Sequence, residues 1–503
     1  MTRTGRILGG VAMGYVQQTV LTLVGLWLTA FLLGRLGEAD YGMWLAATQL
    51  LGILLLLDLG VVALVPRETA FATGAGGHER STAEVALSAA RSARLVRWQW
   101  PGVAAAALLA WWMLPDQWEV IRDPLGLVLL AFVVLFPARL WQAVLNGLQD
   151  LAWLGGASLA TWLAGTALTV VLLLLELGLM ALAVGWVLQS VGNAALWWWR
   201  LHARFPEAVP RGPAAFAPGM LRDRLARSAW VSVAQVANIL TAGADLLLIG
   251  HVLGPAAVVP YFCTAKVATV LGHQVKAIAL ASQPALAELR VAESQERVAL
   301  ATRALTQVLL LGTGLVACVV LTVNAGFVSW WVGSEQYAGP ALTLAILAAM
   351  FVRHWNTGAV HGLFAFAEDR RISLTALAEG VATVLITLAL LPRIGVLGAA
   401  IALAAATLLV SIPFNGAAIV RALGPSGRGL VTDLVSFTWR FLPLAALCTL
   451  VGERWQPGTL PALVLATLGS GAIFVALFLP LARRGPLGVY LEPRLARRRW
   501  RRG

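Results

Sequence analysis

Apolar stretches of about twenty residues recur along the whole chain, and short segments that carry most of the charged residues separate them. A helix of that length crosses the hydrocarbon core of a bilayer. The pattern therefore predicts an all-α polytopic membrane protein with about fourteen transmembrane helices. The predicted spans are 7–33, 41–65, 98–114, 125–145, 153–175, 177–199, 229–250, 257–282, 304–328, 338–366, 373–391, 395–418, 434–451 and 459–482. Connections as short as Glu176 and 392–394 predict tight helical hairpins.

The composition supports this interpretation. The chain has 503 residues, of which 59% are hydrophobic and 12% are charged, whereas soluble proteins carry about 25% charged residues. The first apolar stretch is longer than the core of a signal peptide and no A-x-A site follows it, so it is interpreted as an uncleaved first span. The three cysteines, Cys263, Cys318 and Cys448, lie in apolar segments without the spacing of a disulfide framework or a metal site.

The net charge of +13 raises the question of nucleic-acid binding, but the distribution of the basic residues gives a better explanation. Of the 37 Lys and Arg residues, 28 lie at the two termini and in alternate connections, and the opposite connections hold 4. This asymmetry is the positive-inside pattern of a membrane protein. It predicts that both termini are cytoplasmic and that nucleic acid is not a partner.

An internal repeat with an offset near 215 residues runs through the chain. Gly34 and Gly250 are 216 apart, Arg139-Leu-Trp echoes Arg353-His-Trp at 214, and Gly178 and Gly395 are 217 apart. Each half then holds six spans, an even number, so the two halves are predicted to run in the same direction and to be related by a pseudo-two-fold axis along the membrane normal. The predicted regions are one six-helix lobe at 1–205, a second at 206–422, two additional helices at 423–482 and a basic cytoplasmic tail at 483–503.

Two of the charged residues at membrane depth occupy matching positions in the repeat. Arg139 lies in the fourth predicted span and Arg353 in the tenth. At 100° per residue, Gln142 and Asn146 share a face with Arg139, and Asn356, Thr357 and His361 share a broad face with Arg353. Ionised residues in a span normally face a cavity or a partner, so these faces are predicted to bind an anionic substrate. The alternative is that each arginine snorkels or pairs with a nearby carboxylate.

Other polar residues within the spans are weaker candidates. Gln18 in the first span and Gln235 in the seventh are candidate substrate-binding residues, with interhelical hydrogen bonding as the alternative. Asp245 is a candidate for ion coupling, and Lys266, a candidate substrate-binding residue, is also a possible partner for Asp245. Asp58 is interpreted as an ion-coupling gate or as a structural cap.

Several segments resemble polysaccharide biosynthesis export proteins, the O-antigen (Wzx-type) flippases of the multidrug/oligosaccharidyl-lipid/polysaccharide exporter superfamily. The resemblance lies in LLGRLGEADYGMW and LLLLDLGVVALVPRE near the start, in ADLLLIGHVLGP at 244–255, and in LLPRIGVLGAAIALAA at 390–405. It implies two six-helix lobes around a cationic cavity. It also implies alternating-access transport of undecaprenyl-pyrophosphate-linked oligosaccharide across the cell inner membrane, for O-antigen, capsule or other surface polysaccharide assembly.

The implied partners are membrane lipid, the lipid-linked oligosaccharide and polysaccharide polymerase machinery. No cofactor is expected, and no P-loop motif G-x-x-x-x-G-K-[ST] is present, so an ion gradient or the membrane potential is expected to drive transport rather than ATP.

Three alternative functions remain. A cation-coupled multidrug exporter of the same superfamily would favour acidic residues in its cavity, and a lipid II-type flippase would share the cationic cavity. A membrane enzyme acting on polyprenyl phosphate would need clustered acidic or histidine residues in a loop, and here the loop acids are scattered. The chain is therefore expected not to be an enzyme.

Overall fold

The computed structural model of the chain describes residues 3–74, 78–209, 220–292, 294–366 and 368–491. These residues are almost entirely helical, and they divide into two compact units, unit 1 (Met1–Ile239) and unit 2 (Leu240–Gly503). The helices of unit 1 are α1 (Arg3–Leu54), α2 (Val61–Gly74), α3 (His78–Trp112), α4 (Glu119–Leu135), α5 (Arg139–Gly147), α6 (Leu151–Leu174), α7 (Leu179–Arg204) and α8 (Met220–Ala242), whose last residues enter unit 2. Short 3-10 turns at Leu55–Asp58, Asp116–Trp118, Phe136–Ala138 and Pro206–Ala208 connect them.

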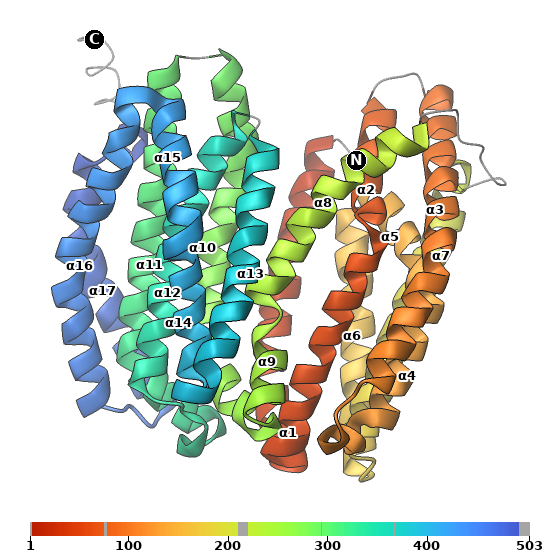
Figure 1. Ribbon diagram of the computed structural model, residues 1–503, viewed down its shortest axis with the longest axis horizontal. Helices are drawn as coiled ribbons and strands as arrows, with labels where there is room; N and C mark the ends of the chain where they lie inside the picture. Colours follow the sequence, from red (N-terminus) through yellow and green to blue (C-terminus); the bar gives the residue numbers. More distant parts are fainter. Residues whose placement is uncertain (1–2, 75–77, 210–219, 293, 367, 492–503) are drawn as a thin grey trace. The chain divides into compact units, whose positions relative to one another are not determined.

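Unit 2 contains a second set of long helices, with two more after them (Figure 1). They are α9 (Asp245–Val252), α10 (Val258–Ala292), α11 (Gln295–Val332), α12 (Pro340–Phe364), α13 (Asp369–Ile394), α14 (Leu397–Ala406), α15 (Ile412–Leu423), α16 (Arg428–Arg454), α17 (Leu460–Arg484) and α18 (Gly488–Leu491). A π-helical segment, Thr407–Ser411, joins α14 to α15, and 3-10 turns lie at Pro255–Ala257, Ser334–Gln336 and Gly424–Gly427.

The structure confirms a polytopic helical membrane fold. Within the described residues, nine helical stretches are long and apolar enough to cross a bilayer, and the pair Ser232–Thr241 and Asp245–Val252 forms a tenth if it counts as one span. The stretch Leu397–Arg454 contains two of the predicted spans, and α1 with the turn after it holds the first span and most of the second. Many large apolar side chains are exposed, among them Trp439 at 78% and Leu465 at 68%, as expected of a surface solvated by lipid.

The predicted hairpins are present, and glycines make their bends. Gly178 (φ +54°) lies between α6 and α7, and Gly395 (φ +63°) lies between α13 and α14. Gly37 (φ +79°), at the kink inside α1, and Gly254 (φ +92°), after α9, form a second pair at the same spacing of 217 residues. A side chain strains this left-handed conformation, which glycine adopts freely. The bends of the two units therefore occur at matching positions of the predicted repeat.

Two predicted spans contain breaks that the hydrophobic pattern did not reveal. The second predicted span, 41–65, is interrupted by the 3-10 turn at Leu55–Asp58 and by Leu59 and Gly60, which both have positive φ. The twelfth, 395–418, contains the π-helical segment. Most residues at these positions are apolar, so apolar periodicity alone cannot locate the interruptions.

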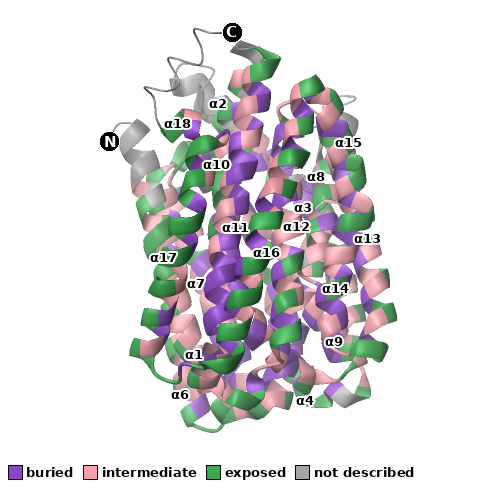
Figure 2. Ribbon diagram, turned by 90° about the vertical axis from the view of Figure 1, so that its left-hand side faces the viewer, coloured by how far each residue is buried: buried purple, intermediate pink, exposed green. Residues whose placement is uncertain are grey.

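The core of unit 2 is built around α11. This helix packs against α10, α12, α16 and α17, and it is the most buried of the membrane-spanning stretches (Figure 2). Gly314 of α11 leaves room for Phe437 of α16 and Phe474 of α17. These phenylalanines stack with Phe441 and Phe478 in one aromatic cluster. The two C-terminal helices are therefore an integral part of the core of unit 2.

The hairpin of α6 and α7 depends on close backbone contact at Gly165 and Gly185. A Cβ atom on Gly185 would lie 2.7 Å from the carbonyl oxygen of Gly165 and would collide with Thr169. We expect Gly185→Ala to lower the free energy of unfolding by about 1–3 kcal/mol, because the two helices must separate. Thermal unfolding of the purified protein in detergent measures this loss. Gly469→Ala in α17, where nothing lies within 4 Å, is the matched control; equal melting temperatures for both variants would contradict the packing described.

Candidate functional site

Arg139 forms an ion pair with Asp58 inside unit 1. The Nη2 atom of Arg139, the first residue of α5, lies 3.0 Å from Oδ2 of Asp58 in the turn that follows α1. The Asp58 side chain is 1% exposed, and its Oδ1 accepts a hydrogen bond of 2.7 Å from the backbone N–H of Gly60. The Arg139 side chain is 26% exposed and its Nη1 atom has no hydrogen-bond partner. The carboxylate is thus fully enclosed, whereas the arginine keeps a partly open side.

Close packing of α2 on α5 brings this pair together. Gly147 of α5 approaches α2 so closely that a Cβ atom there would lie 2.8 Å from the carbonyl oxygen of Pro66 and would collide with Thr69. The positive φ angles of Leu59 and Gly60 turn the chain directly after Asp58, so that α2 begins against α5. The break in the second span is therefore what places a carboxylate beside Arg139.

The predicted polar face of α5 is present. Gln142 and Asn146 are exposed and Arg139 is half-buried, whereas Leu140 and Val144 on the opposite side are buried. A helix that is polar on one face and apolar on the other presents the polar face to water or to a ligand. The three residues of this stripe are therefore arranged as the sequence predicted.

Arg353 has the corresponding arrangement inside unit 2. Its Nε atom lies 3.9 Å from Oε1 of Glu379 in α13, and the two side chains are 27% and 7% exposed. The Glu379 carboxylate also accepts hydrogen bonds from the hydroxyl groups of Thr407 (2.8 Å) and Ser411, which lie in the π-helical segment. A π-helical turn changes which side chains share a face. Here it accompanies two hydroxyl donors that converge on one buried carboxylate.

The rest of the predicted face of α12 is only partly open. Asn356 is half-buried, and its Oδ1 accepts a hydrogen bond of 3.0 Å from Nδ2 of Asn415 in α15. The hydroxyl of Thr357 donates to the backbone carbonyl of Arg353. His361 is buried at 5% exposure, so the prediction that it shares an accessible face with Arg353 is wrong. It lies two turns further along α12, where the helix packs against α11 and α15.

The acidic partners do not follow the repeat that relates the two arginines. A shift of 214 residues, which relates Arg139 to Arg353, takes Asp58 to Gly272 and Glu379 to Gly165. Asp58 comes from the break in the second span, and Glu379 comes from the middle of a regular helix. The arginine is thus the feature common to the two units, and each unit balances its charge in its own way.

Asp245 lies at the start of α9 and is half-buried in unit 2. Its Oδ1 accepts from the backbone N–H of Leu246 at 2.9 Å, and its Oδ2 accepts from the hydroxyl of Tyr261 at 3.1 Å. Both residues line a small cavity of about 20 Å³, together with Thr241, Thr383 and Thr387. A cavity of this size holds one water molecule or one small ion.

The predicted partner of Asp245 is incorrect. Lys266 lies one turn beyond Tyr261 on α10, where its ammonium group packs 4.7 Å from the centre of the Phe262 ring. Among the described residues no salt bridge joins it to Asp245. A hydroxyl donor therefore satisfies the carboxylate where a cation was expected.

The two candidate glutamines lie on α1 and α8. Gln18 is exposed, and its Nε2 donates to the hydroxyl of Thr22 at 3.4 Å on the same helix. Gln235 is half-buried. The Gln18 contact lies within one helix, which does not correspond to the interhelical hydrogen bond considered as the alternative.

Three structural ion pairs were not identified from the sequence, although Glu379 had been considered as an ambiguous acid of the eleventh predicted span. Glu379 pairs with Arg353. Asp150 forms a bidentate ion pair with Arg200, and Asp433 forms a bidentate ion pair with Arg303. No local motif indicates these pairs, because the two residues of each pair are 26 to 130 positions apart in the sequence. The cost of an unpaired charge in a membrane is the general signal that would have prompted the search for partners.

Comparisons with known proteins agree with this architecture. Residues 127–311 match the sequence profile of a family described as polysaccharide biosynthesis protein. The fold is similar to that of the lipid II flippase MurJ in an inward-closed conformation, with a TM-score of 0.65 at 10% identity over 95% of this chain and 100% of that one.

It is also similar to an outward-facing multidrug-resistance MATE transporter of the MOP superfamily, with a TM-score of 0.54 at 13% identity over 83% of this chain and 95% of that one. A MOP superfamily transporter from Pyrococcus furiosus gives 0.52 at 13% identity, over 83% and 96%. No curated protein matches the sequence significantly. At these identities the structural comparisons establish a shared fold.

The pairing of Arg139 with a buried carboxylate predicts unequal effects of single and double substitutions. We expect Arg139→Gln to lower the free energy of unfolding by about 3 kcal/mol, because it leaves Asp58 buried without a counter-charge. The double variant Asp58→Asn/Arg139→Gln should regain most of this loss, since no buried charge remains. Thermal unfolding in detergent compares them, with Arg440→Gln as control, because exposed Arg440 hydrogen-bonds, within the described part of the chain, to Ser436 on its own helix. A double variant no more stable than Arg139→Gln would contradict the ion pair.

Proposed function

We propose that the chain is a flippase that moves undecaprenyl-pyrophosphate-linked oligosaccharide across the cell inner membrane by alternating access, for the assembly of a surface polysaccharide such as O-antigen or capsule. Both termini would then be cytoplasmic, as the distribution of basic residues predicts. The family match over residues 127–311 and the fold shared with a lipid II flippase over 95% of the chain support this proposal.

The observation that carries the proposal is the pair of half-exposed arginines, each held by a buried carboxylate. A diphosphate needs cationic donors at membrane depth, and the planar guanidinium group matches phosphate oxygens with several N–H donors at once. The contacts with Asp58 and Glu379 use one nitrogen of each guanidinium group. The ion pairs leave the other N–H donors of Arg139 and Arg353 unused, and among these Nη1 of Arg139 is itself buried.

The carboxylates give the arginines a stable state without substrate. An arginine alone in a span costs several kcal/mol of insertion free energy, and a buried partner reduces that cost. When the diphosphate arrives, it adds negative charge to a guanidinium group that is already oriented. On this proposal Gln142 and Asn146 contribute further donors from the same face of α5. Asp58 acts as the partner of Arg139, and this contact replaces the ion-coupling role considered from sequence.

A small cation bound at Asp245 is the proposed source of coupling. The half-buried carboxylate, the hydroxyl of Tyr261 and the neighbouring threonines supply oxygen atoms around the 20 Å³ cavity. Hard monovalent and divalent cations prefer oxygen ligands, and a proton on Asp245 would satisfy the same site. Either ion would neutralise a charge that burial makes costly.

Two functions of the same fold class compete with this one. A lipid II-type flippase would use the same arginines for the same diphosphate, and only the sugar would differ. A multidrug exporter is supported by the fold shared with MATE transporters. Protection of drug-sensitive cells against cationic dyes would favour the exporter. A flippase whose substrate site exposes arginines would repel cationic dyes and would give no such protection.

The flippase proposal predicts loss of transport in variants that stay folded. We expect Asp58→Asn/Arg139→Gln and Glu379→Gln/Arg353→Gln each to flip at least about tenfold more slowly than wild type, because each removes charge-assisted hydrogen bonds to the diphosphate. The assay uses proteoliposomes with labelled lipid-linked oligosaccharide and follows its exposure to a glycosidase that cannot cross the membrane.

Arg440→Gln is the matched control for these variants, since it removes an exposed arginine of α16 that forms no ion pair with a carboxylate in the described part of the chain. It should flip at the wild-type rate. Flipping at the wild-type rate by both neutral double variants would show that the arginines serve only to balance buried charge, and the substrate site would lie elsewhere.

The coupling proposal predicts that Asp245→Asn removes the response of transport to an imposed sodium or proton gradient. The amide cannot bind a proton at neutral pH and carries no charge for a metal ion, whereas Tyr261→Phe should weaken the response without abolishing it. The same proteoliposomes, loaded with either gradient, provide the measurement. Asp116→Asn, an exposed acid in the connection before α4, is the control; a normal gradient response in Asp245→Asn would remove Asp245 from the mechanism.

A further inference from the structure

A second cavity of unit 2 lies at one end of α11 and α16, and it shares no lining residue with the cavity at Asp245. Its volume is about 240 Å³, and it lies where α11 ends, α12 begins and α16 ends. Its polar lining consists of Tyr337, Thr343, Thr449, Glu453 and Gln456, and Leu321, Ala325 and Pro340 line its apolar part. This volume is below the range of about 300–1,000 Å³ that is typical of drug-sized ligands, and it suits a small polar group.

One wall of this cavity is rigid. The hydroxyl groups of Tyr337 and Thr343 are hydrogen-bonded at 3.2 Å, and the buried amide of Asn324 donates to Thr343 at 3.1 Å. Asn324 also donates to the carbonyl oxygen of Thr264, and the Thr264 hydroxyl accepts from the backbone of Ala338. This network fixes the tyrosine ring and the loop that carries it before any ligand binds.

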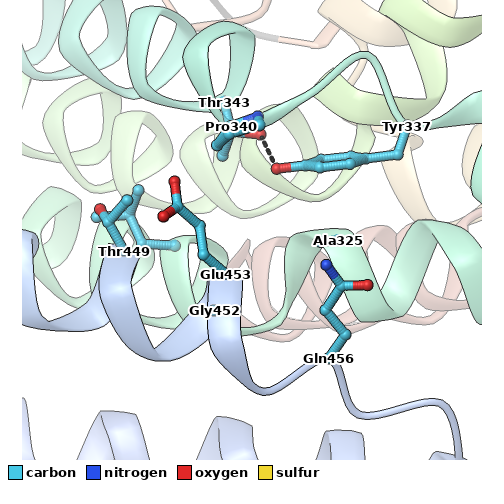
Figure 3. A pocket seen from close by; sticks show the side chains of 9 residues that line it. Ala325, Tyr337, Pro340, Thr343, Thr449, Gly452, Glu453 and Gln456 are labelled. Carbon is cyan, nitrogen blue, oxygen red and sulfur yellow. Dashed lines mark hydrogen bonds between the residues drawn. The ribbon is translucent and has the colours of Figure 1, made fainter.

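The opposite wall carries the exposed polar side chains of Glu453 and Gln456. Figure 3 shows the Glu453 carboxylate pointing from the last turn of α16 toward Thr343 and Pro340, with Gln456 beside it. Among the described residues neither Glu453 nor Gln456 has an ion-pair or side-chain hydrogen-bond partner, although the chain carries a net charge of +13. Gly452 allows α16 to touch the backbone of Leu321 directly, which brings Glu453 close to the fixed wall.

The chemistry of the lining favours a primary ammonium group. The free carboxylate, the amide oxygen and the hydroxyl oxygens are all acceptors, and an ammonium group offers three N–H donors and a positive charge. The face of a tyrosine ring also attracts cations.

The position of the cavity indicates the source of this group. Trp455, which lies between the lining residues Glu453 and Gln456 in the sequence, is 48% exposed, and Trp330 near the end of α11 is 46% exposed, as in the aromatic belts at the membrane–water interface. At that depth the surrounding molecules are lipid headgroups. Arg454, the residue after Glu453, is exposed, and a cation next to the cavity would complement the phosphate of the same headgroup.

We propose that the cavity formed by Tyr337, Thr343, Thr449, Glu453 and Gln456 binds the headgroup ammonium of an aminophospholipid such as phosphatidylethanolamine. The site is built by α16 against α11 and α12, so it gives the C-terminal helices a binding role of their own. It holds whether or not the arginines of the proposed function bind a diphosphate.

Native mass spectrometry of the full-length protein in detergent tests the proposal, with phosphatidylethanolamine, phosphatidylcholine and phosphatidylglycerol of matched acyl chains as probes. We expect one phosphatidylethanolamine to bind preferentially, because the trimethylammonium of phosphatidylcholine has no N–H donors and phosphatidylglycerol has no cation. Glu453→Gln should weaken its binding by about tenfold or more, since it removes a charge-assisted hydrogen bond. The lipid should also raise the melting temperature of wild type more than that of Glu453→Gln.

Glu335→Gln is the matched control. Glu335 is an exposed acid in the connection that also carries Tyr337, and it does not line the cavity. It should retain wild-type affinity. Equal lipid preference in wild type and Glu453→Gln, or equal loss in Glu335→Gln, would overturn the site. Saturation by free ethanolamine at concentrations where the phospholipid does not bind would overturn the lipid as its source.

Discussion

The cost of ionised side chains at membrane depth is the constraint on which the rest of this structure depends. Asp58 and Glu379 are almost completely enclosed, and each is tolerated there because an arginine lies beside it. The same contact orients Arg139 and Arg353 and leaves part of each side chain exposed. On the proposed function, one arrangement thus serves both charge balance and the binding of an anionic substrate. The double substitutions separate these two roles, because they leave no buried charge to balance and also remove the guanidinium donors.

Local irregularities of the backbone deliver these contacts. The 3-10 turn and the two left-handed residues at 58–60 place Asp58 against α5, and the π-helical segment brings Thr407 and Ser411 onto Glu379. In lipid, a broken helix is tolerated only where protein or a water-filled cavity satisfies the freed backbone groups. The interruptions coincide with the buried carboxylates, which connects a feature of the backbone to the chemistry of the proposed site.

The sequence predicted the helices, the hairpins and the exposed stripe of Arg139, Gln142 and Asn146, because apolar periodicity and membrane length govern all three. It left open whether the arginines pair with carboxylates, and it could not identify Glu379 as the partner of Arg353, since that contact depends on how α12 packs on α13. The burial of His361 and the contact of Asp245 with Tyr261 were missed for the same reason. Helical periodicity gives the direction in which a side chain points around the helix axis. Tertiary packing decides which neighbouring helix covers that side chain.

Solid-state NMR of the protein in lipid, with ¹⁵N-labelled arginine and bound lipid-linked oligosaccharide diphosphate, tests the central claim most directly. A guanidinium nitrogen that donates to a phosphate oxygen lies about 4 Å from phosphorus. The account predicts ³¹P–¹⁵N dipolar coupling at that distance, reduced in Asp58→Asn/Arg139→Gln, further reduced when Glu379→Gln/Arg353→Gln is added, and unchanged in Arg440→Gln. Full coupling in the variant that lacks both Arg139 and Arg353, or none in the wild type with bound substrate, would contradict it.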